Sequence, residues 1–288
     1  MDLNHCIIIP AKNEADFIGK TLESIVNQSR LPKELIVVDD HSTDQTREIV
    51  QEFVQRHDFI QLVSSKDAQE AHLPGAKIIQ AFYDGLAHAQ QDWDLISKFD
   101  ADVILPKNYL EKLHHFFQQN PQTGIAGGKI YIFKEGAWIF EKIAKSDHVR
   151  GAIKTYSKAC FQKIGGPRRS IGWDTADEIL ALFYGFEIKV LNDLSVKLLK
   201  PTGTVYQAIH GQKIGQSFYR LDYGCCISGI AAAKASWNKK SFPLFFEIAK
   251  GYFQAWKNDD PKMFNPAEGK FARAFRWQGI FAQLKKAK

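Results

Sequence analysis

The chain has 288 residues, a formal net charge of +6, 45% hydrophobic residues and 24% charged residues. These values are typical of a globular protein with a substantial core, and they exclude a disordered, collagen-like or low-complexity chain. The four cysteines show no CxxC spacing, so we expect a reducing, cytoplasmic location and no disulfide scaffold or cysteine-rich zinc module. We expect no signal peptide, and no membrane span because no window approaches about 18 uninterrupted apolar residues.

Strands and helices alternate regularly over the first hundred residues. Short apolar runs rich in β-branched residues predict strands, and Ile18, Leu22 and Ile25 recur at the spacing of a helix face. Ser42 to Gln45 has the pattern of a capping box that opens a helix. Such alternation indicates an α/β fold with a parallel sheet and helices on both faces. We expect strands at 5–10, 34–38, 59–63 and 95–99, and helices at 15–28, after Gln45 and at 76–90.

The rest of the chain is more mixed and becomes basic towards its end. Patterning predicts strands at 124–133, 150–157 and 186–191, helices at 138–145 and 175–184, and mainly helices from residue 205 onward. Residues 201–288 carry a net charge of +9, against −3 for residues 1–200. Such asymmetry suits an acidic partner such as an anionic membrane or nucleic acid, and equally a solvated basic surface.

Acidic residues follow two of the predicted strands. Asp39 and Asp40 come after one strand, and Asp100 and Asp102 come after another. Ligands of open α/β sheets bind at the carboxyl ends of strands. In an extended segment Asp100 and Asp102 point the same way, so one Mg²⁺ or Mn²⁺ ion could lie between them. Alternatively, Asp-x-Asp is a common loop sequence with no ligand.

Three segments in this order resemble the inverting family 2 glycosyltransferases, which have the GT-A fold. They are IIIPAKNEADFIGKTLESIVNQ, ELIVVDDHSTDQT and FDADVILPKNYLEKL. The resemblance covers about residues 5–203. It implies a catalytic domain at 1–204, divided into a nucleotide-binding half (1–103) and an acceptor half (104–204), and a basic helical region at 205–288.

The resemblance also implies a binding site for a nucleotide-sugar donor. In the family, Asp40 with Asp39 beside it reads the edge of a pyrimidine ring, which suits a carboxylate because the ring N–H is a donor. The last Asp of the metal motif, Asp102, binds the divalent metal that the diphosphate carries. The donor contacts implied in full are Pro10, Ala11, Asn13, Glu14, Asp39, Asp40, Lys77 and Asp100. Individually, these residues could equally cap helices, form turns or face solvent.

Inverting transfer needs a carboxylate that deprotonates the acceptor hydroxyl. In the family the base is an Asp that follows a Glu, about 11 residues before a Gly. Counting back from Gly185 reaches Asp174, but Trp173 stands where the Glu is usual. The base is therefore Asp174, Asp177 or Glu178, in that order of preference. Asp174 could instead be an N-cap with Asp177 completing it, and Trp173 could stack on a sugar or fill the core.

The remaining candidates concern the diphosphate and the acceptor. Lys200 stands where relatives carry an Arg, and the His that often serves there as a further metal ligand is missing, with His210 as a possible substitute. The Gly-rich loop that contains Arg168 and Arg169 could close over the diphosphate or acceptor. Arg273-Ala-Phe-Arg276-Trp277 matches the RxxRW letters of processive synthases, and we interpret it as part of an amphipathic basic helix.

The function expected is metal-assisted, inverting transfer from a nucleotide sugar, UDP-sugar by preference, to a hydroxyl of a saccharide or lipid-linked acceptor. One alternative is a sugar nucleotidyltransferase, although the first loop lacks the glycine-rich phosphate cradle of such enzymes. The other is a basic module that binds an anionic membrane or, less in keeping with the sequence, nucleic acid. Contact of the C-terminal region with the cytoplasmic face of a membrane is compatible with the enzyme as well.

Overall fold

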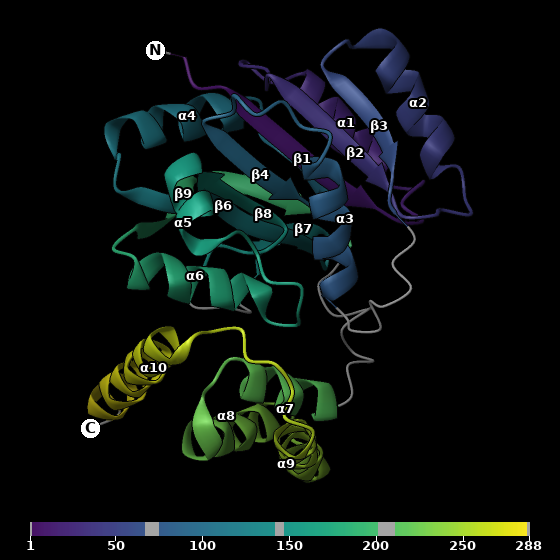
Figure 1. Cartoon of the computed structure of the whole chain (residues 1–288). Coiled ribbons are helices and arrows are strands. Elements are labelled where there is room, and N and C mark those ends of the chain that lie inside the picture. The colour runs from purple at the N-terminus through teal and green to yellow at the C-terminus, as the bar shows by residue number, and fades with distance from the viewer. Residues whose placement is uncertain (1, 67–74, 142–146, 201–210, 287–288) are drawn as a thin grey trace.

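The computed structural model of the chain describes residues 2–66, 75–141, 147–200 and 211–286 (Figure 1). Its first half is the predicted alternation of strand and helix. The strand predicted at 95–99 is found with the same first and last residues. The elements are β1 (His5–Ala11), α1 (Ile18–Val26), β2 (Glu34–Asp39), α2 (Thr46–Arg56), β3 (Ile60–Ser64), α3 (Ala76–Leu86) and β4 (Leu95–Phe99).

The second part of the chain completes the sheet and covers it. Its elements are β5 (Val103–Ile104), α4 (Tyr109–Gln119), β6 (Thr123–Lys134), β7 (Ala137–Phe140), β8 (Ile153–Ser157), α5 (Lys158–Ile164), α6 (Trp173–Phe183) and β9 (Glu187–Leu198). The sheet order is β3-β2-β1-β4-β8-β6-β9-β5, with β7 beside β6. Strands β3, β2, β1 and β4 are parallel, and antiparallel pairing begins between β4 and β8.

Both faces of the sheet are buried, which explains the continuous apolar runs of its central strands. Ile7 and Ile9 of β1 belong to a core shared with α1, α2 and α4. Cys6 and Ile8 point to the other face and join the core formed with α3, α5 and α6. The predicted α/β fold, with helices on both faces of the sheet, is therefore confirmed.

Two local predictions are wrong. The segment from 138 begins as strand β7, not a helix, and its Phe133–Trp138 and Tyr131–Phe140 ring pairs hold it against β6. The rest of that predicted helix, 142–146, lies outside the described residues.

The second wrong prediction is the capping box at Ser42. Helix α2 begins at Thr46, and the Ser42 hydroxyl accepts a hydrogen bond from the Asn13 amide at 3.0 Å. Asp44 accepts the Thr46 amide at 3.0 Å in its place. The polar side chains of this loop thus serve a neighbouring loop rather than their own helix.

The C-terminal region is helical, as predicted, with helices α7 (Gly211–Arg220), α8 (Gly224–Asn238), α9 (Phe242–Lys257) and α10 (Pro266–Lys286). They lie beyond α6 in Figure 1. Apolar residues of α6, α8 and α10 share one core, and the Tyr184 hydroxyl donates to Glu268 at 2.8 Å. The boundary predicted between 204 and 205 falls outside the described residues. None of the described helices is long and apolar enough to cross a bilayer.

The basic helix predicted around residues 273–277 is part of α10, and two of its arginines have partners inside the molecule. Arg273 forms an ion pair with Asp222, and Arg276 lies 4.8 Å over the Tyr223 ring. Trp277 packs against the core that α6 shares. Two of its charges are therefore used inside the molecule, to fasten α10 to the start of α8.

Candidate active site

The carboxyl ends of β1, β2 and β4 meet at one edge of the sheet because the three strands are parallel. Main-chain hydrogen bonds tie the segments that follow them. The Asp40 amide donates to the Ala11 carbonyl at 2.8 Å, and the Ser65 amide donates to the Asp39 carbonyl at 2.9 Å. Pro10 and Ala11 are buried at the end of β1, so their main chain, not their side chains, faces this edge.

The loop after β1 is held by the loop after β2. Asn13 has a positive φ of 54°, a conformation that Asn tolerates better than most residues. Its side-chain oxygen accepts the Thr43 amide at 2.8 Å. The Glu14 amide donates to the Thr46 hydroxyl at 2.7 Å. The main-chain amides of Asn13 and Glu14 are both hydrogen-bonded within the protein, which fixes the path of this loop.

The two acids after β2 have different surroundings. Asp39 is buried, accepts the Ser42 amide at 3.2 Å and lies 3.4 Å from Arg47. Asp40 is more exposed, accepts the Ser65 hydroxyl at 2.8 Å and lies 3.4 Å from the Lys12 amine. Asp39 is thus committed to the turn, and Asp40 is the acid that a ligand can reach.

Three carboxylates gather near the end of β4. Glu14 pairs with Lys200 at 2.5 Å, and Asp100 pairs with the buried Lys98. Asp102 lies in a turn and is almost buried. Burial, and then the charges of Asp100 and Glu14, raise the pKa of Asp102 to about 7. Burial likewise raises the pKa of Glu14, against the lowering effect of Lys200.

This cluster has the donor chemistry for a divalent cation. Within the described residues, no group of three or more His, Cys, Asp or Glu side chains is arranged to hold a metal ion. A raised Asp102 pKa signals negative charge that a cation would relieve, and carboxylate oxygen suits Mg²⁺ and Mn²⁺. Asp102 therefore fits a cation that takes its other ligands from phosphate and water. Asp100, paired with Lys98, fits less well, and His210 lies outside the described residues.

The predicted phosphate-binding residues of α3 and of the 165–172 loop are brought near each other. Lys77 is exposed on the first turn of α3. The Tyr83 hydroxyl of the same helix donates to the Pro167 carbonyl at 2.9 Å, and Arg169 lies 4.3 Å over the Tyr83 ring. Arg168 is half-buried in that loop. The loop is therefore fastened to α3 and is not a free flap over the site.

Trp173 is buried between two lysines that come from adjacent strands. Lys98 of β4 and Lys154 of β8 are paired across the sheet, and each amine lies 5.6 Å from the Trp173 ring. A Cβ on Gly151 would lie 2.8 Å from that ring, so only glycine fits there. Trp173 thus fills core space beside two buried lysines, and it is not free to stack on a sugar.

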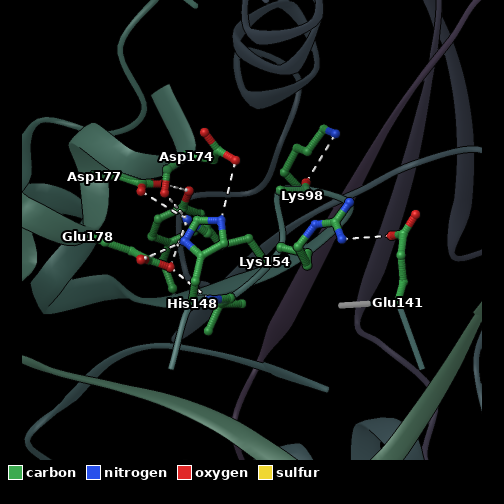
Figure 2. Close-up of polar contacts among 11 residues, drawn as sticks. Lys98, Glu141, His148, Lys154, Asp174, Asp177 and Glu178 are labelled. Carbon is green, nitrogen blue, oxygen red and sulfur yellow. Dashed lines mark hydrogen bonds and ion pairs between the residues drawn. The ribbon is translucent and has the colours of Figure 1, made fainter. Parts of the chain in front are cut away.

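His148 lies between two of the candidate bases (Figure 2). Its Nδ1 is 2.8 Å from Glu178 and its Nε2 is 3.5 Å from Asp174. Burial opposes the charged imidazole, but these two carboxylates raise the pKa of His148 to about 9. Burial alone would raise the pKa of Asp174, but His148 and then Lys154 lower it to about 2. Asp174 is therefore an ionised carboxylate, and 34% of its side chain is exposed.

Asp177 and Glu178 are held inside the protein. Asp177 is fully buried, lies 2.9 Å from the Lys154 amine and accepts the Tyr156 hydroxyl. Burial raises the pKa of Asp177 to about 7, against the lowering effect of Lys154. Glu178 accepts the Val149 amide at 2.8 Å as well as bonding to His148. The geometry therefore favours Asp174 as the acid that meets a ligand. Asp174 is in the first turn of α6, whose N-cap is Gly172, so it is not the helix cap.

One short segment joins the two acidic groups. The Asp100 amide donates to the Ala152 carbonyl at 2.9 Å, and the Lys98 amine donates to the Gly151 carbonyl at 3.2 Å. A Cβ on Gly151 would lie 3.4 Å from the Asp174 Cβ. The acidic segment that begins at Asp100 and the candidate base Asp174 therefore both contact residues 151–152.

Sequence reasoning missed His148, Lys98 and Lys154. For the lysines a signal exists, because each interrupts an apolar strand at a position whose neighbours are buried, and a buried amine requires an acidic partner. His148 carries no such signal, since it precedes a strand in an irregular segment.

Comparison with known proteins decides the family. The family model described as "Glycosyl transferase family 2" matches residues 6–171, which is more than half of the chain. The chain belongs to glycosyl transferase family 2. Membership of this family favours the predicted glycosyltransferase over the nucleotidyltransferase and the binding module. The matched range ends before Asp174, so it contains the acids at the strand ends but none of the candidate bases.

Two curated relatives match part of this chain and less than half of their own length. It is 28% identical over 212 residues to the probable glycosyltransferase YdaM of Bacillus subtilis, covering 65% of this chain and 46% of that one. It is 26% identical over 182 residues to the poly-β-1,6-N-acetyl-D-glucosamine synthase of Staphylococcus epidermidis, covering 58% and 41%. The chain spans less than half the length of these two relatives.

Solved structures confirm the GT-A-like fold. Residues 1–349 of Staphylococcus aureus TarS with UDP-GlcNAc match with a TM-score of 0.60 and 20% identity, over 76% of this chain and 65% of that one. The mannosyltransferase PcManGT of Pyrobaculum calidifontis, with GDP-Man and Mn²⁺, matches with a TM-score of 0.56 and 18% identity, over 98% and 76%. At these identities the likeness extends to the fold alone.

Proposed function

We propose that this glycosyltransferase moves a sugar from a UDP-sugar to a hydroxyl of a saccharide or lipid-linked acceptor, with inversion and with a divalent cation. One observation carries the proposal. A partly exposed, ionised Asp174 and the acidic segment that begins at Asp100 both contact residues 151–152, at the edge where parallel strands end, and the crowded acid Asp102 lies two residues further along that segment. A base and a diphosphate site must be this near for one sugar to pass between them.

Each end of the donor has a candidate contact. The Asp40 carboxylate, beside the loop of Asn13, would accept the ring N–H of uracil. Glu14 and Lys200 form an ion pair at the edge of the same cluster, so Lys200 is near enough to meet a phosphate oxygen once the donor enters. Lys77 and Arg168 or Arg169 would supply further positive charge from the α3 side. A cation on Asp102 would stabilise the negative charge of the departing diphosphate.

Asp174 would act as the general base. Its carboxylate accepts the proton of the acceptor hydroxyl while the hydroxyl oxygen bonds to the anomeric carbon and the bond from that carbon to the phosphate oxygen breaks. The bonding electrons leave with the diphosphate. His148 orients Asp174 through one ring nitrogen while Glu178 holds the other. Direct attack from the opposite face gives inversion.

Titration of the protein with UDP and with GDP, each with and without Mn²⁺, tests the donor site. We expect UDP to bind and to need the metal. A relative of the same fold binds UDP-GlcNAc and another binds GDP-Man, so preference for GDP would replace uracil recognition at Asp40 while keeping the enzyme class. Failure of both nucleotides to bind a folded protein would overturn the donor site. The anomeric configuration of the product, measured by NMR, tests inversion.

A further inference from the structure

Helix α9 has two apolar faces, and only one of them is used inside the molecule. Its inner face packs backbone to backbone on α7, because a Cβ on Gly215 would lie 1.9 Å from the Ile248 carbonyl and one on Gly251 would lie 1.9 Å from the Gln212 carbonyl. Ile248, Gly251 and Tyr252 are buried there. The contact is complete without the residues on the other side of the helix.

The outer face of α9 carries a stripe of exposed aromatic residues. Phe242, Phe246, Phe253 and Trp256 follow one another at steps of four, seven and three residues, which places them along one side of a helix. All four are exposed, Phe242 by 76% and Phe246 by 57%. Single exposed apolar residues are ordinary, but an aligned set of large rings is a feature of binding surfaces.

Helix α8 extends this stripe into a surface. Ile230, Ala233 and Trp237 lie on its exposed side, and Trp237 is 85% exposed. A groove of about 720 Å³ runs between the end of α8 and the start of α9, lined by Trp237, Phe242 and Phe246 among others. We call the exposed residues of the two helices the aromatic surface: Ile230, Ala233, Trp237, Phe242, Phe246, Phe253 and Trp256.

The charge around the aromatic surface is mainly positive. Residues 224–257 contain five lysines, at 234, 239, 240, 250 and 257, and one acid, Glu247. Glu247 accepts the Gly211 amide at the start of α7 at 3.0 Å, so part of its hydrogen-bonding capacity is used within the protein. The turn between the helices presents Lys239 and Lys240 next to the most exposed rings.

We propose that the aromatic surface docks the protein onto an anionic lipid bilayer, with α8 and α9 in the plane of the interface. Trp and Phe rings enter the boundary between headgroups and acyl chains, while the lysine amines meet lipid phosphates. A second copy of the chain is a poorer occupant, because it would bring five lysines against five. Rings beside lysines also suit a single-stranded nucleic acid, so RNA binding is one of the outcomes of the test.

Flotation of the full chain with vesicles of 70% phosphatidylcholine and 30% phosphatidylserine, against pure phosphatidylcholine, tests this docking. We expect binding to the anionic vesicles and much weaker binding to the neutral ones. The variant Trp237→Ser/Phe242→Ser/Phe246→Ser should lose about a hundredfold or more in affinity. The control Phe133→Ser removes a ring of similar exposure from β6 and should leave vesicle binding unchanged.

The lysines are tested separately. Lys239→Gln/Lys240→Gln should weaken binding to anionic vesicles about thirtyfold, or about fivefold for each charge. The matched control is Lys20→Gln/Lys107→Gln, which removes two exposed charges that lie outside α8 and α9. Unchanged circular dichroism and thermal unfolding of each variant show that its fold is intact, and neither measurement depends on donor binding.

Three results would overturn the docking proposal. The first is no binding of the folded chain to anionic vesicles. The second is vesicle binding that the triple aromatic variant retains in full. The third is a dimer in solution that this variant dissociates, or binding of a 20-nucleotide RNA that it abolishes, with no vesicle binding in either case. Loss of UDP binding, by contrast, would overturn the proposed donor and leave the docking surface untouched.

Discussion

The two sides of the candidate active site are held by different kinds of contact. On the donor side, loops after neighbouring parallel strands hold each other by short-range polar contacts, such as the Thr43 amide on Asn13 and the Thr46 hydroxyl on Glu14. On the side of the candidate base, α6 is fixed by buried charges, with Lys154 and His148 bonded to its three acids. The first arrangement tolerates the loss of one contact, whereas the second concentrates its stability in a few side chains.

The largest effect should be the loss of turnover when the candidate base Asp174 is replaced. Asp174→Asn should lower kcat about 10²- to 10⁴-fold, the usual contribution of a general base, and leave UDP affinity within about twofold. Steady-state UDP release from the preferred donor, with titration for affinity, measures the two effects. Asp193→Asn, on an exposed carboxylate of β9 paired with Lys112, is the control. If Asp177→Asn loses turnover while Asp174→Asn keeps it, the assignment of the base is wrong.

The second effect is on stability. Lys154→Met should lower the free energy of unfolding by about 3–5 kcal/mol, because it leaves the buried Asp177 without its cation. Chemical denaturation measures it. Lys189→Met removes an exposed lysine that pairs with Glu187, and should cost less than about 1 kcal/mol. Equal losses for the two variants would show that the buried network is not what holds α6.

A pH-dependent effect should come from His148. Its raised pKa means that the folded state binds the proton more tightly than the unfolded chain, so the stabilisation is complete below about pH 6.5 and disappears as the pH rises to about 9. The stability difference between the wild type and His148→Gln should fall by up to about 3 kcal/mol over that range. Denaturation at a series of pH values measures it, and a difference that is flat with pH contradicts the assignment.

A smaller effect of opposite sign is expected on the donor side. Asp102→Asn removes one of three crowded carboxylates, so in EDTA at pH 8 it should raise the free energy of unfolding by about 1–3 kcal/mol. The same change should abolish the dependence of UDP binding on Mn²⁺. Because the pKa of Asp102 is raised, the gain in stability of Asp102→Asn is absent below about pH 4 and grows towards pH 7. A variant that is less stable and still binds UDP through Mn²⁺ would refute both roles of Asp102.

The smallest effect separates the two acids after β2. Asp40→Asn should weaken UDP binding about tenfold, the loss of one charge-assisted hydrogen bond, with little change in stability. Asp39→Asn should lower stability by about 1 kcal/mol through the turn of Ser42 and Arg47 and change UDP affinity little. Titration and thermal unfolding of the pair test this, and the reverse pattern would exchange their roles.

Much of the donor side could be predicted from sequence. Its elements are local, its strands have the continuous apolar pattern of a parallel sheet, and its acids follow those strands directly. The capping box at Ser42 shows the limit of this reasoning. The motif is present, but Asn13 binds that hydroxyl from another loop, and local patterns carry no information about such a competitor.

The base side could be narrowed to three acids but not further. Asp174, Asp177 and Glu178 are equally acidic in sequence, and burial and partners distinguish them. Asp177 faces Lys154 and Tyr156 inside the core, whereas Asp174 keeps part of its side chain in solvent. The partners come from β8 and from the segment before it, some 20 to 30 residues earlier in the chain.

The sequence by itself determined the α/β alternation, the family and the edge of the sheet at which its acids gather, because the apolar pattern of each strand and the residues that follow it are local properties. Only the tertiary structure decided which acid is exposed, which lysines neutralise the others and which apolar face of α9 is left open. These depend on pairs of residues distant in sequence, such as Lys98 and Lys154, whose amines both lie 5.6 Å from the Trp173 ring. The free energy of a charge or a ring depends on its surroundings, and only folding creates them.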